Sequence, residues 1–456
     1  MMADYLPHTD VEVAEMLAFL GVEDLAALFD VVPAALRLSG GLDLDAGLSE
    51  PDVIAEFDAL ASRNRPIGRE LVCFAGAGAY DREVPAVVRA LSSRSEFVTA
   101  YTPYQPEVAQ GVLQAIFEYQ TMVARLAGLP IANASLYDGA SSLVEAINCA
   151  VGATGRQRVL VSAGVHPHWR AVADTMSRGT GHHLETIPLA DGTTQWSAAA
   201  AGDPVAAVVV AQPNFVGCLE DLAAAKGLAE TAGALFIVAA DPVAAGVLRS
   251  GGAHGADLVV GEGQALGTRL SFGGPYLGLF ACSRELVRRL PGRLVGETVD
   301  LDGTRAYVTT LRAREQDIRR EKATSNVCTN QTLMAVTAAI QLSWLGPAGL
   351  TEVATRSARG AHYCSDELAA QGVLPAVSAP FLFEFPVRTS SLADVVLARL
   401  ADEGFLGGVA ASALLDGADG SLGTMDLDHT VIVAVTERRT RQEIDAFVSA
   451  FAKAAR

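Results

Sequence analysis

The residue best placed for chemistry is Asp241, which directly follows an apolar run at 234–240 and precedes Pro242. The run is short and apolar throughout, so it predicts a buried β-strand. A carboxylate at the carboxyl end of a parallel strand lies where α/β proteins bind their ligands. Asp241 is therefore a candidate binding group at the edge of a predicted sheet.

The strand that follows Asp241 lacks the group that would complete such a site. In enzymes that bind pyridoxal phosphate on this kind of sheet, the aspartate keeps the pyridine nitrogen protonated. A lysine one strand later then holds the cofactor as a Schiff base. Here the next strand runs into Val259–Gly267 (VVGEGQALG), which contains no lysine. The residues therefore outline a cofactor domain without a covalent anchor.

Lysine is scarce in the whole chain, which has only Lys226, Lys322 and Lys453. Lys226 falls in a helix-like segment before the strand that leads to Asp241. Lys322 falls in a largely basic run at 319–322 and predicts a solvated or interfacial charge. A self-sufficient, aminotransferase-like enzyme would need Lys226 or Lys322 beside Asp241, and the order of the predicted strands argues against this.

Two further segments could bind ligands or simply begin helices. In Ala134–Glu145 (ASLYDGASSLVE), an irregular stretch opens a predicted helix whose free backbone N–H groups could hold a phosphate. Asp138 and Ser141 could equally be ordinary N-caps. His166 lies near a predicted strand end, and with His168 it could be a metal ligand. For two histidines alone, a helix-start or surface role is favoured.

These residues belong to an alternating α/β pattern between about residues 107 and 320. Fully apolar strands separated by helices favour a mostly parallel sheet that is covered on both faces. The predicted strands are 159–162, 205–212, 234–240, 258–261 and 277–282. The predicted helices are 107–127, 139–151, 168–177 and 220–231.

The chain divides into an N-terminal helical arm at 1–70, a large α/β domain at 71–325 and a smaller α+β domain at 326–456. In the arm, Thr9 and Glu12 have the spacing of a capping box. The C-terminal part has predicted helices at 331–346 and 442–455 and predicted strands at 381–387 and 431–435.

The composition disfavours several classes of function. The net charge of -18 argues against binding to nucleic acid or anionic lipid. The longest apolar run, 234–248, is broken by Asp241 and Pro242, so we expect no membrane span. No signal peptide is evident, which leaves the cytoplasm as the expected location. The six scattered cysteines predict reduced core residues, and a hydrophobic content of 50% favours a partner surface.

Several strings, in order along the chain, resemble signatures of glycine decarboxylase, the P-protein of the glycine cleavage system. They are Tyr101–Gly111 (YTPYQPEVAQG), Asn133–Ser141 (NASLYDGAS), Ala211–Asp221 (AQPNFVGCLED), Val259–Gly267, Leu270–Gly278 (LSFGGPYLG) and Ile318–Gln331 (IRREKATSNVCTNQ). The resemblance implies the aminotransferase-like fold type I of pyridoxal-phosphate enzymes, with a large, mostly parallel α/β domain and a smaller C-terminal domain.

In some bacteria this protein is split into two subunits that resemble each other. The resemblance implies that only the second type carries the lysine, within a His-Lys sequence ahead of a Gly-Gly-Pro element. Counting back from Gly273-Gly274-Pro275, the equivalent position is Gln264, and a glutamine cannot form an aldimine. The chain therefore resembles the N-terminal-type subunit 1, with pyridoxal phosphate bound by its partner and no cofactor bound covalently here.

The resemblance also implies a shared reaction. Together with subunit 2, the chain is expected to decarboxylate glycine and transfer the aminomethyl group to the lipoyl arm of the H-protein, as a glycine dehydrogenase (aminomethyl-transferring, decarboxylating). A tetramer with two copies of each chain is expected. The alternative is a catalytically decayed scaffold or regulator on the same fold.

Two groups of residues receive expected roles. We hypothesise that a loop before the first long helix reaches the partner's cofactor site, or only packs the interface; it comprises Tyr101, Thr102, Pro103, Tyr104, Gln105 and Glu107. A vacated cofactor pocket within this chain is expected to include Asp138, Ser141, His166, Asp241 and Gln264.

Overall fold

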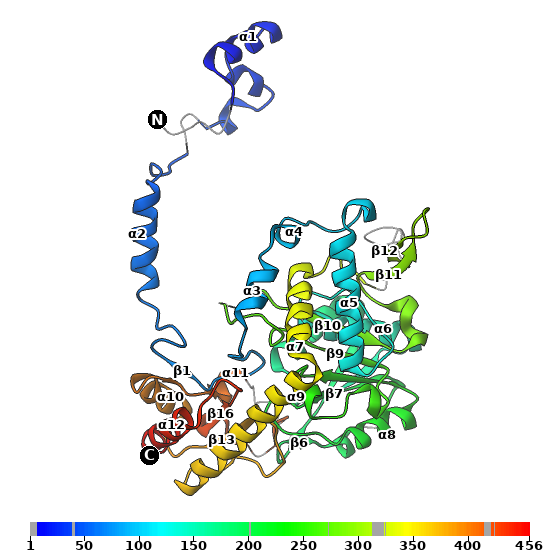
Figure 1. Cartoon of the computed structure of the whole chain (residues 1–456), viewed down its shortest axis with the longest axis vertical. Coiled ribbons are helices and arrows are strands. Elements are labelled where there is room, and N and C mark those ends of the chain that lie inside the picture. Colours follow the sequence, from blue (N-terminus) through cyan, green and yellow to red (C-terminus); the bar gives the residue numbers. More distant parts are fainter. Residues whose placement is uncertain are drawn as a thin grey trace. The chain divides into compact units, whose positions relative to one another are not determined.

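A mixed seven-stranded sheet forms the centre of residues 65–456 in the computed structural model (Figure 1). The strands, in their order across the sheet, are β2 (Ile131–Ala132), β10 (Gly278–Cys282), β9 (Leu258–Glu262), β8 (Leu235–Ala240), β7 (Val205–Gln212), β3 (Arg158–Ser162) and β4 (His183–Ile187). Neighbours are parallel except at β10, which is antiparallel to β9 and β2. The predicted α/β fold with a mostly parallel sheet is confirmed.

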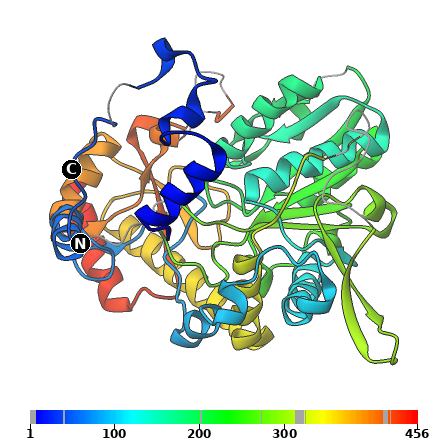
Figure 2. The same cartoon turned by 90° about the horizontal axis from the view of Figure 1, so that it is seen from above.

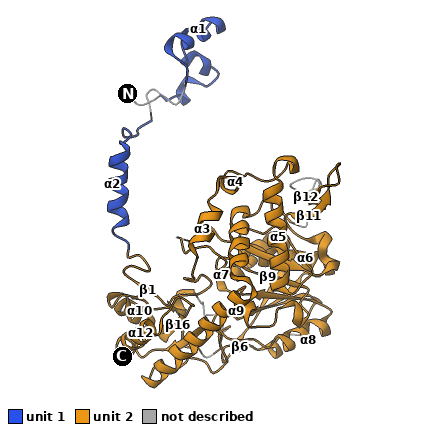
Figure 3. Ribbon diagram, in the orientation of Figure 1, with its two compact units in different colours: residues 1–64 blue, residues 65–456 orange. Residues whose placement is uncertain are grey.

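The structure describes residues 7–38, 42–199, 202–271, 273–311, 323, 325–414, 421–423 and 425–456. Lys322 lies outside the described residues, so the expected role of this lysine is not addressed by the structure. The chain forms two compact units, residues 1–64 and residues 65–456, which Figure 3 colours separately.

Helices cover both faces of the sheet because its strands are apolar on both sides (Figure 2). Val209 and Ile237 point into the core beneath α6, whereas their neighbours Val208 and Val238 belong to the core beneath α5 and α8. This alternation is the two-residue period of a strand. The covering helices are α5 (Gln110–Ala127), α6 (Gly139–Thr154), α7 (Pro167–Thr180) and α8 (Leu222–Ala232).

A smaller C-terminal layer has its own core. Its three-stranded sheet and two helices are β13 (Glu384–Arg388), β16 (Thr430–Ala434), β15 (Val409–Ala410), α10 (Ala393–Asp402) and α12 (Arg441–Ala454). Phe447 of α12 stacks on Phe74, with ring centroids 3.9 Å apart. Phe74 follows β1 (Val72–Cys73), which pairs with β14 (Phe405–Leu406). The segment at 72–74 therefore belongs to the C-terminal core, although it lies early in the sequence.

One long helix, α9 (Thr332–Ala370), joins the two cores, with Ala338 buried in one and Cys364 in the other. The helix has a kink at Gly346, whose backbone is non-helical, and Pro347 follows. By length and composition α9 could cross a membrane, which corrects the expectation that no segment of the chain could. Within the structure it serves as a core helix that packs against α5 and α12.

Residues 7–64 contain helices without a core of their own. The helix α1 (Asp10–Leu20) begins with the predicted capping box between Thr9 and Glu12. The helix α2 (Glu50–Ala61) begins at the N-cap Ser49. No described residue of this unit is buried.

A buried ion pair ties the segment after β1 to the C-terminal layer. Arg82 and Glu437 lie 2.7 Å apart, with side chains that are 3% and 7% exposed. Ser357 of α9 hydrogen bonds to both residues. The Nε and Nη2 atoms of Arg82 have no hydrogen-bond partner among the described residues, so Glu437 is the main compensation for the buried cation.

We expect Glu437→Gln to lower the free energy of unfolding by about 3–5 kcal/mol, because it removes the carboxylate that is hydrogen bonded to the buried Arg82 guanidinium. The matched control is Glu403→Gln, which removes an exposed ion pair to Lys453 of similar length, 2.6 Å. This control should change the free energy of unfolding by less than about 1 kcal/mol. Urea unfolding of the two variants measures both values, and equal effects would contradict the assigned role of Glu437.

Candidate functional site

Three residues singled out in the sequence lie together at the carboxyl ends of the parallel strands. Asp241 follows β8, Gln264 follows β9 and His166 begins α7. They line one pocket, whose other polar or aromatic members include Tyr80, Trp169, Asn214 and Glu262. This is the end of the sheet at which open α/β proteins bind ligands.

Glu262, which sequence reasoning did not single out, organises this pocket. Its carboxylate accepts hydrogen bonds from the backbone N–H groups of Gly139, Gln264 and Leu277, each at 2.9 Å. Burial raises the pKa of Glu262 to about 7, although the three bonds oppose the rise. The available signal was its place at the end of an apolar strand, the criterion that identified Asp241.

The start of α6 is already occupied by groups of this chain. Gly139 is the first residue of the helix and donates its N–H to Glu262. Asp138 is the N-cap, and its side chain accepts the N–H of Ser141 at 2.7 Å. Trp169 fills the space outside, because a side chain at residue 139 would collide with its ring. Asp138 and Ser141 therefore form a helix cap beside the pocket and do not line it.

The side chain of Gln264 is a structural link. It is 1% exposed, and its Oε1 accepts the N–H of Tyr80 at 3.0 Å. Its Nε2 donates to the carbonyl groups of Tyr80 (3.2 Å) and Thr268 (2.7 Å). The amide therefore fastens the Tyr80 segment to the loop after β9, and all of its hydrogen bonds go to protein backbone.

His166 is a neutral helix cap. Its Nδ1 accepts the N–H of His168 at 3.1 Å, which leaves Nε2 to donate to the carbonyl of Ala77 at 3.2 Å. Burial lowers the pKa of His166 to about 4. The ring stacks on Trp169 and meets Phe215 edge to face. Among the described residues, no group of three or more metal-ligating side chains was found.

The side chain of Asp241 stabilises the turn that follows β8. Its Oδ1 accepts the N–H groups of Val243 at 2.7 Å and Ala244 at 3.0 Å. Burial raises the pKa of Asp241, and the nearby Arg82 is the largest opposing influence. Both hydrogen bonds engage the same carboxylate oxygen, so the other oxygen is the atom of Asp241 most available to a group in the pocket.

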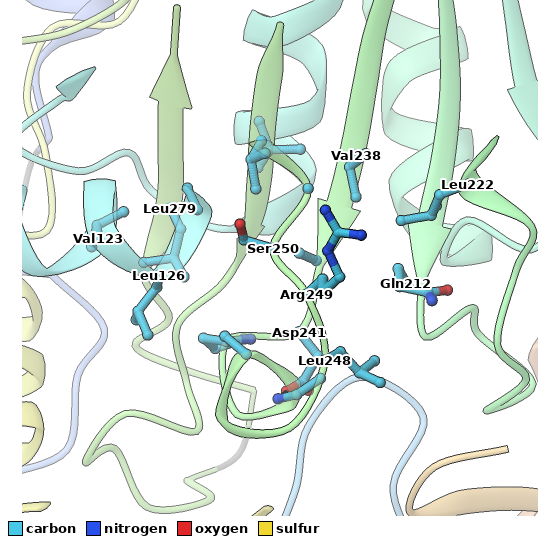
Figure 4. A pocket seen from close by; sticks show the side chains of 18 residues that line it. Val123, Leu126, Gln212, Leu222, Val238, Asp241, Leu248, Arg249, Ser250 and Leu279 are labelled. Carbon is cyan, nitrogen blue, oxygen red and sulfur yellow. Dashed lines mark hydrogen bonds between the residues drawn. The ribbon is translucent and has the colours of Figure 1, made fainter. Parts of the chain in front are cut away.

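A second pocket lies on the opposite face of the sheet, and Asp241 contributes to it as well (Figure 4). Its walls are apolar and include Val123 and Leu126 of α5 and Val238 of β8. Arg249 is the other charged residue in its lining. The space exists because the connection from β8 to β9 is made of short 3-10 turns and not of a covering α-helix.

Neither described lysine supplies an amine to the Asp241 pocket. Lys226 lies on α8, 3.6 Å from Glu230, and Lys453 pairs with Glu403. Neither appears in the lining of the pocket. Lys226 is therefore unsuited to the role that a self-sufficient, aminotransferase-like enzyme would require.

The loop before α5 lies apart from the Asp241 pocket and contributes nothing to its lining. Pro103 is buried and anchors the loop, whereas the Thr102 carbonyl accepts the N–H of Tyr104 at 2.8 Å. The guanidinium carbon of Arg293 lies 4.9 Å from the centroid of the Tyr104 ring. The exposed members of the loop are Tyr101, Tyr104, Gln105 and Glu107.

Glu384 of β13 holds the Tyr80 segment from the other side. Its carboxyl group is buried and accepts the Ala77 N–H at 2.7 Å and the Tyr80 hydroxyl at 2.8 Å. Burial raises the pKa of Glu384 from its usual 4.5 to about 7. The folded chain therefore keeps a proton that the unfolded chain releases between these two pH values, and stability falls as the pH rises through this window.

We expect Glu384→Gln to increase the free energy of unfolding by about 2 kcal/mol at pH 8 and to have little effect at pH 4.5. The glutamine can accept from Ala77 and donate to the Tyr80 hydroxyl oxygen while carrying no charge. Unfolding by urea at the two pH values measures the difference. A variant that is less stable than the parent at pH 8 would show that the ionised carboxylate is needed.

The sequence of this chain is similar to a family of known proteins over nearly its whole length. The family described as "Glycine cleavage system P-protein" matches residues 3–451. A probable glycine dehydrogenase (decarboxylating) subunit 1 from Moorella thermoacetica is 48% identical over 451 residues, covering 98% of both chains. One from Geobacillus thermodenitrificans is 46% identical over 453 residues, again covering 98% of each.

A solved structure of the same family also matches this chain over almost its whole length. The crystal structure of an inhibitor-bound glycine decarboxylase (P-protein) of the glycine cleavage system has a TM-score of 0.89 and 45% identity, covering 99% of this chain and 100% of that one. A cysteine desulfurase from Thermococcus onnurineus has a TM-score of 0.61 at 16% identity, covering 90% of this chain and 99% of that one, and shows the fold alone. The chain belongs to the P-protein family of the glycine cleavage system.

Proposed function

We propose that this chain is the non-lysine subunit of a two-subunit glycine decarboxylase. With a lysine-bearing partner it decarboxylates glycine and passes the aminomethyl group to the lipoyl arm of an H-protein. The relatives carry the name subunit 1, which supports a partner chain. The observation that carries the division of roles is Gln264, whose side-chain amide is fully engaged with the backbone of Tyr80 and Thr268.

The residues of this chain do not fit pyridoxal phosphate. A phosphate is an anion, and the helix start that could receive it is already bonded to the Glu262 carboxylate and closed by Trp169. No described lysine lines the pocket. The family and the aminotransferase-like fold link the chain to pyridoxal-phosphate chemistry, and we place the cofactor on the partner subunit.

What this chain offers the partner is an exposed and stiffened loop. Tyr101 is 83% exposed and Tyr104 is 47% exposed, while Pro103, which lies between them in the sequence, is buried. Behind the loop, Gln110 at the start of α5 is held by the hairpin of β11 (Leu294–Val299) and β12 (Arg305–Thr310). The side chain of Gln110 exchanges two hydrogen bonds with the backbone of Tyr307. The loop therefore sits on a fixed platform, as a segment that orients a substrate in a neighbouring site must.

We expect Tyr104→Phe and Thr102→Ala to lower the rate of glycine decarboxylation by the two-chain enzyme by about 10–100-fold without dissociating it, because both groups position the reaction from the loop. Tyr363→Phe is the matched control, since this tyrosine bonds Asp445 in the C-terminal layer. Turnover is measured with saturating H-protein, and assembly by size-exclusion chromatography. Unchanged turnover in both loop variants would mean that the loop only packs the interface.

The placement of the cofactor is tested on the separate chains. We expect the purified chain, incubated with pyridoxal phosphate and borohydride, to acquire no covalent pyridoxyl group at this pocket, and the lysine-bearing partner to acquire one. Mixing the chains should give glycine-dependent exchange of CO2 when H-protein is present. The molecular mass of the complex should correspond to two copies of each chain. A scaffold or regulator would bind the partner and leave this exchange unchanged, and turnover by this chain alone would overturn the proposal.

A further inference from the structure

The described residues of the N-terminal unit, 7–38 and 42–64, leave many large apolar side chains exposed. Among the described residues of this unit, seventeen Val, Leu, Ile, Met and Phe side chains are exposed and none is buried. Phe19 is 90% exposed and Phe57 is 67% exposed. At roughly 50 Å² each, such side chains offer on the order of 800 Å², which is what one partner contributes to a stable protein interface.

The helices of this unit are specified by the sequence but are too short to be stable alone. α1 has 11 residues and α2 has 12, and both begin with side-chain caps. Isolated helices shorter than about 12–15 residues are marginal in water, so most of their stability comes from packing an apolar face. Val53, Ile54, Phe57 and Leu60 are spaced to share one face of α2, and all four are exposed.

The charge of this unit limits which molecules could bind its apolar side chains. Residues 1–64 contain thirteen acidic and two basic residues, so they carry -11 of the net charge of -18. The remaining residues carry -7. A second copy of this chain would therefore bring like charges together, which disfavours association. A surface that suits this unit is apolar at its centre and basic at its rim.

We infer that the described residues 7–38 and 42–64 form a clasp that docks by its exposed apolar side chains on the lysine-bearing subunit. This inference rests on the proposed function, which supplies the second chain, and it names the surface through which the two chains are joined. Phe19 and Phe57 are its central contacts, because large, exposed aromatic side chains carry much of the energy of interfaces. The acidic residues between them face the basic rim of the partner.

The test uses the full-length chain with Phe57→Ser, beside Ala55→Ser on the same helix. Ala55 is also exposed and lies roughly 160° around the helix from Phe57. Affinity for the purified lysine-bearing subunit is measured by titration calorimetry, and thermal unfolding of each isolated variant is recorded as a second readout. Phe57→Ser should weaken binding by at least about tenfold. Ala55→Ser should bind like the parent, both isolated variants should unfold like the parent, and higher salt should slow association.

Each other outcome has a separate meaning. If the parent chain forms no complex with the lysine-bearing subunit, the proposed function itself fails. If it forms one and Phe57→Ser binds equally tightly, the clasp is overturned while the function stands. A lower unfolding temperature of isolated Phe57→Ser with unchanged affinity would show that residues 7–64 cover their own chain. Self-association of the parent that is lost in Phe57→Ser would show that the occupant is a second copy, and either result rejects the inference.

Discussion

The hydrogen bonds that converge on the carboxylate of Glu262 determine what the large domain can do. Their donors come from the start of α6, from the loop after β9 and from the segment leading into β10. A parallel sheet brings such segments together only at the carboxyl ends of its strands. The orphan N–H groups of a helix start need an acceptor, and here the protein supplies one. The domain therefore satisfies its own helix start without any bound anion.

The residues around this pocket hold the large sheet and the C-terminal layer together. Gln264 fastens the Tyr80 segment from the side of β9, and Glu384 fastens it from the C-terminal layer. Burial raises the pKa of both carboxyl groups, Glu262 and Glu384, to about 7. Burying them has a free-energy cost that exposed residues would avoid, and the several hydrogen bonds to each carboxyl offset it. The same bonds fix the relative positions of the sheet and the C-terminal layer.

The strands and helices near this pocket were largely predictable, because fully buried strands appear as continuous apolar runs. β7 begins and ends at the predicted residues, and β8 and β9 differ by one residue at one end. β4 was missed because it is an edge strand whose sequence, HLETI, is half polar and mostly not buried. α9 continues far beyond its predicted end because its helical hydrogen bonding resumes after Gly346, which a local pattern of glycine and proline does not indicate.

The partners of the site residues were not predictable, because they come from distant parts of the sequence. Asp241 could be placed from a local strand pattern and Gln264 from the family resemblance, and the structure brings them together with His166. The Tyr80 segment that Gln264 binds lies 184 residues away, and Glu384 lies 304 residues from the tyrosine that it holds. Asp138 and Ser141 were placed correctly at a helix start. Their separation from the pocket depends on Glu262 and on the Trp169 ring, which no local pattern connects to that helix.

Under the proposed division of roles the partner holds the cofactor, so this chain must hold its functional surfaces in place by internal contacts alone. The loop at Tyr104 meets this requirement, because Pro103 is buried and Arg293 packs on the tyrosine ring. Residues 7–64 do not meet it, since they bury nothing among their described residues. In the proposed assembly the two surfaces therefore differ: the loop is ordered before binding, and the arm is completed by binding. The proposed assembly needs both surfaces, which is a reason for a fold without a covalent anchor to keep its architecture.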